Sequence, residues 1–419
     1  MRIAFVSQAL DSVLPPNQNS VGIWTYQTAL HLAPRHEVLV LSRRGRGLPK
    51  QSESGGVRFD FVPVLPGRLW DAAGRARRAL GLGGTHFFAR PYYRAEYVAQ
   101  CIRRLRAFKP DVIHVHNFVN HLPAFRRSFP DAVLVIHMHC DWLVELDREE
   151  TARNLGAADI VVGCSDHVAQ SARRRFPELR QPFANLPNGI GPAPARASGP
   201  GANETVITVG RVSPEKGVHV LLEAWAQVRA ARPRAELRIV GPMAVCPREL
   251  LVDLSTDPDV QALSRFYPER GRPHRPYGET LRAMVPEAQA ASVHFVGSEP
   301  HARVLERFQE AAVLVSPSLS EAFGMSLVEA MAAGTPVVAS RVGGMTEVVE
   351  KTGGGLLVTK ADPAALAAAI IQLLEDPGLR ERLGGEGRAR VSELYGWNSV
   401  AATAETLYAE AAAGRRVRG

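Results

Sequence analysis

The chain has 419 residues, of which 46% are hydrophobic, 22% charged and 7% aromatic, and its formal net charge is +8. This length predicts two domains of about 200 residues each, and the composition excludes disordered, fibrous and coiled-coil proteins. No window approaches the roughly 18 to 20 consecutive apolar residues of a membrane span. The N-terminus leads directly into a strand-like run and the four cysteines are scattered, so we expect a cytoplasmic protein without a signal peptide, zinc ribbon or disulfide framework.

The first half alternates short apolar runs with helix-period segments. Continuous apolar runs of this length are typical of parallel strands covered on both faces, so the alternation predicts a doubly wound parallel sheet. The expected strands are residues 3–6, 37–41, 111–115, 132–136 and 159–163, and the expected helices include residues 24–33 and 98–108. Gly22 stands at the start of the first helix, where the missing Cβ would let a ligand approach the backbone closely.

The charge is concentrated in residues 66–109. This segment carries a basic surplus equal to the net charge of the whole chain. Such a stretch indicates an anionic partner, either a phosphorylated acceptor, a lipid headgroup or a nucleic acid, or else an arginine-rich helical face in water. Its basic residues are Arg68, Arg75, Arg77, Arg78, Arg90, Arg94, Arg103, Arg104, Arg106 and Lys109, against Asp71 and Glu96.

Two pairs of histidines end two of the expected strands. His114 and His116 form one pair and His137 and His139 the other, and alternation places both members of each pair on the same face of the sheet. With His121 nearby, these residues offer a metal site as the alternative interpretation. We favour a histidine that donates a hydrogen bond to the substrate, because no carboxylate has an obvious ligand spacing.

A Pro- and Gly-rich stretch near the middle of the chain marks the domain boundary. We expect a first domain at residues 1–190, a linker at 191–202 and a second domain at 203–395. A tail helix at 396–419 would cross back to the first domain. The second domain repeats the same pattern, and two such domains facing each other would form a cleft. Its expected strands are residues 206–209, 237–240, 293–296, 313–315, 336–339 and 355–358, and its expected helices are 218–231, 327–333 and 364–375.

A basic loop follows the first strand of the second domain. Gly210, Arg211, Lys216 and Gly217 frame a turn that we expect to open a helix. Free backbone N–H groups and the positive end of the helix dipole meet there, and an arginine and a lysine add two full charges. The combination suits a diphosphate. The spacing matches neither the G-x-G-x-x-G nor the Walker fingerprint.

Two stretches remain in the second domain. The longer one begins at Cys246 and ends at Gln289, is rich in Pro and Arg, and predicts short helices that face the cleft or a partner. The other is residues 320–334, in which Glu321 lies in a loop directly after a strand. A carboxylate there can accept hydrogen bonds from vicinal sugar hydroxyls. Glu329 follows eight residues later and could accept from a ribose diol. Ser326 and Glu329 also match a capping box at the start of a helix.

These motifs, in this order, resemble the retaining glycosyltransferases of family 4, which have the GT-B fold of two Rossmann-like domains. The resemblance is strongest from residue 206 to 358, where the Glu-x7-Glu element formed by Glu321 and Glu329 is followed by Ala332-Ala333-Gly334-Thr335-Pro336. In the first domain it rests on Val21-Gly22, on Lys109-Pro110-Asp111 before the third strand and on Cys164-Ser165-Asp166. Many members have Gly-Gly where this chain has Val21-Gly22, which implies a looser approach of that loop to the phosphates.

The resemblance implies roles for single residues. Arg211 and Lys216 would hold the donor diphosphate and stabilise the leaving group, Glu329 would bind the ribose, and Glu321 would lie against the transferred sugar. His139 would be the histidine that reaches the substrate, with His137 as the alternative. The implied donor-binding residues are Gly22, Gly210, Arg211, Lys216, Glu321, Phe323, Gly324, Met325, Leu327 and Glu329, with Phe323, Gly324 and Met325 contacting sugar hydroxyls and Leu327 offering an amide to phosphate.

The resulting prediction is a transferase that moves a sugar, with retention, from a nucleotide-diphosphate donor to a glycan, glycolipid or small-molecule acceptor. A UDP-sugar is favoured over a GDP-sugar, and neither a metal nor a cofactor is expected. The alternatives are a non-hydrolysing nucleotide-sugar epimerase and a catalytically silent subunit that binds nucleotide-sugar. Peripheral contact with an anionic membrane through residues 68–106 is an open interpretation, and no nucleic-acid motif is present.

Overall fold

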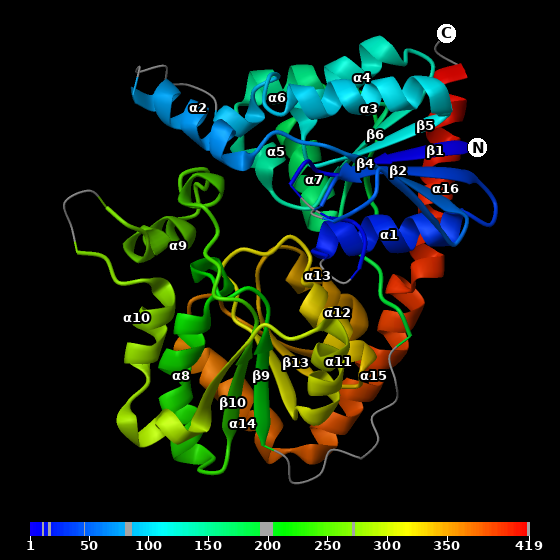
Figure 1. Cartoon of the computed structure of the whole chain (residues 1–419). Coiled ribbons are helices and arrows are strands. Elements are labelled where there is room, and N and C mark those ends of the chain that lie inside the picture. The colour runs from blue at the N-terminus through cyan, green and yellow to red at the C-terminus, as the bar shows by residue number, and fades with distance from the viewer. Residues whose placement is uncertain are drawn as a thin grey trace. The chain divides into compact units, whose positions relative to one another are not determined.

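A computed structural model describes residues 1–10, 12–15, 18–45, 47–79, 86–192, 204–269 and 273–416. The chain divides into two compact units, one comprising Met1–Gly189 with Trp397–Gly419 and the other Ile190–Gly396. Most of the expected linker, residues 193–202, lies outside the described residues. Each unit is built on its own sheet (Figure 1).

The first unit contains an eight-stranded sheet in the order β3-β4-β2-β1-β5-β6-β7-β8. Its strands are β1 (Arg2–Val6), β2 (Glu37–Arg43), β3 (Gln51–Ser54), β4 (Val57–Val62), β5 (Val112–His116), β6 (Val133–Met138), β7 (Ile160–Gly163) and β8 (Phe183–Asn185). Its helices are α1 (Ser20–Leu32), α2 (Gly67–Ala79), α3 (Ala95–Phe108), α4 (Leu122–Ser128), α5 (Trp142–Glu145), α6 (Arg148–Leu155), α7 (Asp166–Arg175) and α16 (Trp397–Arg416).

Three strands of this sheet were not predicted, and one of them makes the sheet mixed. β3 pairs antiparallel with β4, while every other pair in the sheet is parallel. β3 is polar and mostly exposed at the edge of the sheet, so it lacks the apolar run on which the prediction depends. Gly55 and Gly56, with φ of 56° and 76°, close the hairpin, because both central positions of such a tight turn require positive φ.

The core of the first unit lies between the sheet and the helices α1 and α16. Trp24, Phe5 and Phe59 are each fully buried there. α16 adds Trp397, Val400, Ala404 and Tyr408 to the same cluster. The tail of the chain therefore completes the core of the unit that contains the N-terminus.

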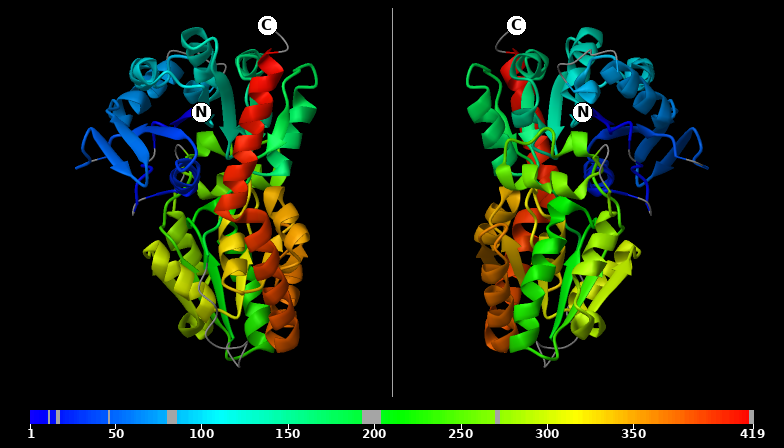
Figure 2. Two further views of the ribbon diagram at one scale, coloured as in Figure 1. Left: turned by 90° about the vertical axis from the view of Figure 1, so that its right-hand side faces the viewer. Right: turned by 90° about the vertical axis from the view of Figure 1, so that its left-hand side faces the viewer.

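The second unit contains a six-stranded, fully parallel sheet in the order β11-β10-β9-β12-β13-β14. Its strands are β9 (Thr205–Val209), β10 (Glu236–Val240), β11 (Val293–Gly297), β12 (Val313–Ser316), β13 (Val337–Ser340) and β14 (Gly355–Val358). Its helices are α8 (Val218–Ala231), α9 (Pro258–Gln261), α10 (Tyr277–Met284), α11 (His301–Glu310), α12 (Met325–Ala332), α13 (Gly343–Thr352), α14 (Pro363–Glu375) and α15 (Pro377–Tyr395). Helices cover both faces of this sheet, as the side views show (Figure 2).

The stretch from Cys246 to Gln289 forms short helices around an apolar cluster of its own. Val252, Val260, Leu263 and Tyr267 pack there with Leu319, which belongs to the segment after β12. Residues 270–272 lie outside the described part of the stretch. The Cys246 amide donates to Ser213 Oγ (2.9 Å), so the start of the stretch is attached to the basic loop.

Candidate functional site

The candidate site of the second unit lies where the strand order reverses. β9 pairs with β10 on one side and with β12 on the other. The connection that leaves β9 therefore runs toward one edge of the sheet, and the one that leaves β12 runs toward the opposite edge. The gap between two such diverging loops, at the carboxyl ends of the strands, is where open α/β sheets bind ligands.

The loop after β9 carries the basic residues and leads into a helix, as the sequence predicts. Pro214–Lys216 forms a 3₁₀ turn, and Gly217 (φ 68°) follows it before α8 begins at Val218. Lys216 thus ends this turn, directly before Gly217, the N-cap of α8, and Arg211 precedes the turn. Together with Gly210 (φ 144°) they line a small open recess above the end of β9.

A carboxylate contacts each of the two basic side chains. Arg211 donates to Glu215 Oε1 (2.7 Å), and the other oxygen of Glu215 accepts from Ser213. Lys216 Nζ lies 2.5 Å from Oε2 of Glu321, which is 105 positions further along the chain and follows β12. The fold thus joins the expected diphosphate lysine directly to the acid expected against the sugar.

The charges of this cluster support one another. Burial alone would lower the pKa of Lys216, but the carboxylates of Glu321 and Glu215 outweigh it and the pKa is raised. The pKa of Arg211 is likewise raised, because Glu215 outweighs the effect of burial. Both side chains are therefore cationic at neutral pH, with the Lys216 side chain 27% exposed and that of Arg211 43% exposed. Two cations that reach solvent at one point are suited to an anionic ligand.

Backbone contacts fix the two loops against each other. The Leu319 amide donates to the Glu215 carbonyl (2.8 Å). A Cβ on Gly217 would lie 1.9 Å from the Pro317 carbonyl oxygen, so only glycine fits there. On the other side, the Gly344 amide donates to the Glu321 carbonyl (3.2 Å). The positions of Lys216 and Glu321 are therefore determined by the backbone as well as by their ion pair.

The predicted capping box at α12 is wrong. The helix begins at Met325, and its N-cap is Gly324 (φ 100°), which has no side chain to accept a hydrogen bond. Ser326 lies inside the first turn. Glu329 instead accepts from His301 Nε2 through Oε1 (2.8 Å), and its side chain is 9% exposed. A residue distant in sequence took the place of the expected local partner.

Phe323, Met325 and Leu327 are predicted to contact the donor, and these roles stay predictions. Phe323 is buried and packs edge-on against Tyr395, and Met325 is partly exposed at the start of α12. The Leu327 amide donates to the Gly324 carbonyl (3.0 Å), so a phosphate would have to share or replace that bond. The amides of a first helical turn point beyond its N-terminal end, which is the orientation that an anion requires.

In the first unit, Gly22 has a structural reason to be glycine. Its amide donates to Oδ1 of Asn19, the N-cap of α1 (2.8 Å). A Cβ at this position would lie 2.5 Å from the Ser12 carbonyl oxygen. The close approach expected of a ligand is made here by the protein backbone, and donor binding by Gly22 remains a prediction.

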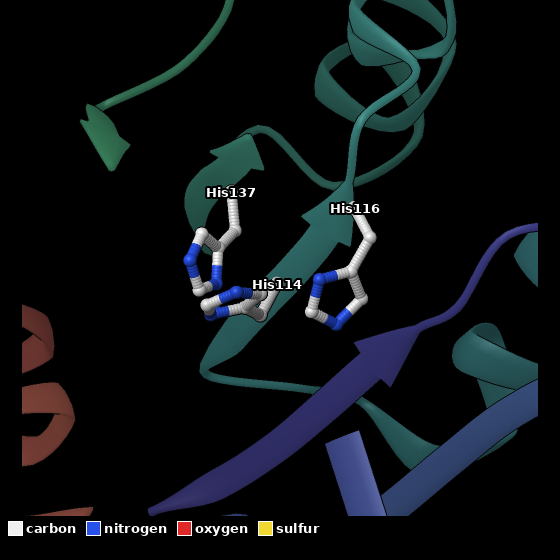
Figure 3. A group of neighbouring side chains, drawn as sticks. All are labelled: His114, His116 and His137. Atoms are coloured by element: carbon white, nitrogen blue, oxygen red, sulfur yellow. The ribbon is translucent and has the colours of Figure 1, made fainter. Parts of the chain in front are cut away.

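The histidines of β5 and β6 form one packed group. His114, His116 and His137 point toward one another from the two strands, with their ligand atoms within 4.8 Å (Figure 3). Burial lowers the pKa of each far below the ordinary value, so all three rings are neutral. Trp24 stacks on His114 (5.1 Å between centroids) and meets His137 edge-on (4.6 Å). The group is part of the aromatic packing beside α1.

His139 is bonded to this group and is the more accessible of the two candidate histidines. The Thr25 hydroxyl donates to Val21, so it accepts from His116 Nε2 (3.1 Å). His116 Nδ1 then accepts from His139 Nε2 (3.0 Å), which leaves Nδ1 of His139 as an acceptor. Burial lowers the pKa of His139 to about 3, although Asn188 opposes the fall. His137 is fully buried, whereas His139 is partly exposed.

We do not assign a metal to the three clustered histidines. His116 already uses both ring nitrogens, toward Thr25 and His139. Among the described residues, the group contains histidines alone and no carboxylate to balance a buried divalent charge. A cation there would have to break one of the hydrogen bonds of His116, and no negatively charged ligand in the group would offset its charge. The expectation that the activity needs no metal remains a prediction.

Sequence reasoning missed two residues of the site. Glu215 is 3% exposed and holds Arg211, and an acid in the middle of a basic loop was the available signal. His301 lies 28 positions before Glu329, and no local pattern connects the two. Arg211, Lys216, Glu321 and their loop contacts are brought together within the second unit. Gly22 and His139 belong to the first unit.

The fold and this site define an α/β class of protein with two largely parallel-sheet units and a basic loop at the switch point of the second sheet. Residues 21–193 match the family model described as Glycosyltransferase Family 4, and residues 195–390 match the one described as Glycosyl transferases group 1. The chain belongs to glycosyltransferase family 4 and is a glycosyltransferase with the GT-B fold.

Relatives and solved structures agree with this assignment. The glycogen synthase of Mycobacterium tuberculosis is 30% identical over 406 residues, which cover 92% of this chain and 89% of that protein. The D-inositol 3-phosphate glycosyltransferase of a Nocardioides species is 30% identical over 358 residues, with 78% and 71% covered. Sucrose-phosphate synthase from Thermosynechococcus elongatus has a similar fold, with a TM-score of 0.75, 24% identity and 99% of both chains covered. No helix among the described residues is long and apolar enough to cross a membrane.

Proposed function

We propose that this glycosyltransferase moves a hexosyl group from a nucleoside diphosphate sugar to a hydroxyl group, with retention and without a metal. The observation that carries the proposal is the contact of Lys216 with Glu321, with Arg211 beside it. A cation for a diphosphate and a carboxylate for sugar hydroxyls meet there at the carboxyl ends of β9 and β12. A diphosphate sugar is the ligand that needs both.

The chemistry follows from where negative charge develops. When the bond between the anomeric carbon and the diphosphate oxygen breaks, charge accumulates on the diphosphate, where Arg211, Lys216 and the first turn of α12 can stabilise it. The acceptor oxygen forms its bond on the same face of the sugar, and its proton passes to the departing phosphate oxygen. The products are the glycoside and the nucleoside diphosphate.

A uracil nucleotide is the favoured donor. A similar fold, Alr3699/HepE of Anabaena, was solved in complex with UDP-glucose and has a TM-score of 0.64, 19% identity and 98% of this chain covered. The relatives named above are called a glycogen synthase and an inositol phosphate glycosyltransferase, and their products therefore differ. The proposal accordingly covers glycan, glycolipid and small-molecule acceptors, and a GDP-sugar is the alternative donor.

Thermal unfolding with nucleotides tests the proposal. UDP, GDP, ADP and TDP are each added with and without sugars to the wild-type protein and to Glu329→Ala. A ligand at about 100 times its Kd adds roughly 2.7 kcal/mol, which shifts the melting temperature by a few degrees. We expect UDP to give a shift that Glu329→Ala loses and that the control Glu375→Ala, at the exposed end of α14, retains. The absence of a shift with every nucleotide would contradict the proposal.

We further propose a cytoplasmic location with peripheral contact to an anionic membrane. Leu65, Leu69 and Tyr92 lie in or beside the basic segment and are 46%, 51% and 47% exposed. Arg103, Arg106 and Lys109 are exposed, but Arg94 is 5% exposed and bonded to the Leu65 carbonyl, so part of the charge is internal. The side chains of Arg68, Arg75, Arg77 and Arg78 lie outside those described. Co-sedimentation with liposomes should increase with anionic lipid content, and no dependence on that content would remove the proposal.

A further inference from the structure

His301 makes a contact that the family resemblance did not lead us to expect. It is the first residue of α11, and its Nε2 atom lies 2.8 Å from Oε1 of Glu329. The two residues sit on different helices, and α11 packs against α12. The His301 side chain is 53% exposed, while that of Glu329 is 9% exposed. One member of the pair thus reaches solvent and the other does not.

A carboxylate as buried as Glu329 requires a donor, because an unpaired buried charge is costly. Glu329 is the one charged residue of α12, and β9, which α11 also contacts, carries none. The other charged residues of α11 have partners elsewhere: Arg303 contacts Glu306 and Glu310, Arg307 contacts Glu299 and Glu310, and Glu310 also contacts Arg238. His301 is therefore the charged partner that faces Glu329.

The contact also sets the protonation of the imidazole. The hydrogen bond to Glu329 raises the pKa of His301 above its ordinary value, against the opposing effect of burial. Glu329 is the charged group responsible. The ring donates from Nε2 in both its neutral and its protonated form, so the geometry survives titration while the charge beside the carboxylate changes.

We propose that His301 is a positioning residue for the nucleoside: it holds Glu329 through Oε1 and so directs Oε2 toward the ribose hydroxyls of the donor. This inference rests on the proposed function, in which Glu329 binds the ribose. A carboxylate has about four acceptor positions, so one bond to His301 leaves enough for a diol. Protonation of His301 draws on the negative charge of the same carboxylate and weakens the bonds it accepts from the ribose.

The test measures the Kd of 2′,3′-dideoxy-UDP divided by the Kd of UDP. This ratio isolates the contribution of the ribose hydroxyls, because the titration of the phosphates affects both ligands equally. Calorimetry on the full chain at pH 8.5 should give a ratio well above one for the wild type. His301→Ala should reduce that ratio roughly 3- to 10-fold, the effect of one lost hydrogen bond. His301→Gln, which keeps a side-chain donor, should restore most of it.

The pH profile adds a readout that a merely structural role would not change. The wild-type ratio should rise between pH 6 and 8.5 as His301 loses its proton, and His301→Gln should show a flat ratio. An unchanged ratio in His301→Ala, while Glu329→Ala abolishes it, would overturn the inference alone. A ratio that survives in Glu329→Ala would overturn the ribose assignment and this inference with it, and no binding of UDP by the wild type would contradict the proposed donor.

Discussion

Lys216 and Glu321 depend on each other in the described site. The Glu321 carboxylate raises the pKa of Lys216, and the Lys216 ammonium donates to that carboxylate. The Gly344 amide holds the backbone of Glu321 through its carbonyl. A bound diphosphate would compete with Glu321 for Lys216 and free that acid for sugar hydroxyls. In the proposed function, this pair would contact both the diphosphate and the sugar of the donor.

Lys216→Ala should abolish turnover and leave the fold intact. Removing one preorganised electrostatic group from a developing anion costs about 10²- to 10³-fold in kcat. The matched control is Lys360→Ala, which removes another partly buried lysine, 25% exposed and paired with Asp257 and Asp259. Transfer rates and melting temperatures are measured for both. Near-normal turnover in the Lys216 variant would refute its assignment.

At the scale of elements, the site depends on how the loop after β9 meets the segment after β12. Gly217 lies at this contact and cannot be replaced without strain. Its φ is positive, and the Pro317 carbonyl occupies the space that a Cβ would need. The sequence signalled a glycine-flanked turn, but nothing local identified its neighbour. The pairing of β9 with β12 brings the two segments together.

Gly217→Ala should lower the free energy of unfolding by more than about 2 kcal/mol, because backbone strain of 1–3 kcal/mol adds to a clash with backbone. Gly334→Ala is the control, since Gly334 has a similar φ of 81° and nothing within 4 Å of its would-be Cβ. Urea unfolding gives both values. Equal losses would show that the contact with Pro317 contributes nothing.

At the scale of the whole molecule, the histidines whose pKa is lowered by their surroundings are distributed unevenly between the two units. The first unit contains five: burial lowers the pKa of His121 to about 4 and that of His139 to about 3, and it holds the pKa values of His114, His116 and His137 well below the ordinary value. In the second unit, burial lowers the pKa of His219 to about 4. Below an ordinary pKa of about 6.5, the unfolded chain binds protons that these folded rings do not.

The first unit should therefore lose stability more steeply than the second as the pH falls from 6.5 toward 4. A folded-state pKa below the unfolded value means that stability rises with pH in this window, by up to about 1.4 kcal/mol per pH unit for each histidine. Hydrogen exchange read by mass spectrometry reports each unit separately at pH 7.5 and 5.5. Equal changes in the two units would contradict the expectation.

Much of the fold could be predicted from the sequence, because parallel strands that are buried on both faces consist of short continuous runs of apolar residues. All six strands of the second sheet and five strands of the first were predicted in this way. The missed strands β3 and β8 are short and lie at the edges of the sheet, and in β4 the charged residues Arg58 and Asp60 interrupt the apolar ones, so none of the three contains a long continuous apolar run. The motifs around Arg211 and Glu321 could also be found in the sequence, because the residues of each motif are adjacent, and their roles in donor binding stay predictions.

Only the tertiary structure decided which side chains touch. Glu329 matched a local capping box, yet His301 on another helix became its partner, and Lys216 found Glu321 across 105 positions. His114 and His137 pack against Trp24 as neutral aromatic rings. The physical reason is common to all three cases. Local periodicity records which face of an element is buried, whereas contacts between loops depend on the order in which strands assemble in the sheet, and that order leaves no pattern in neighbouring residues.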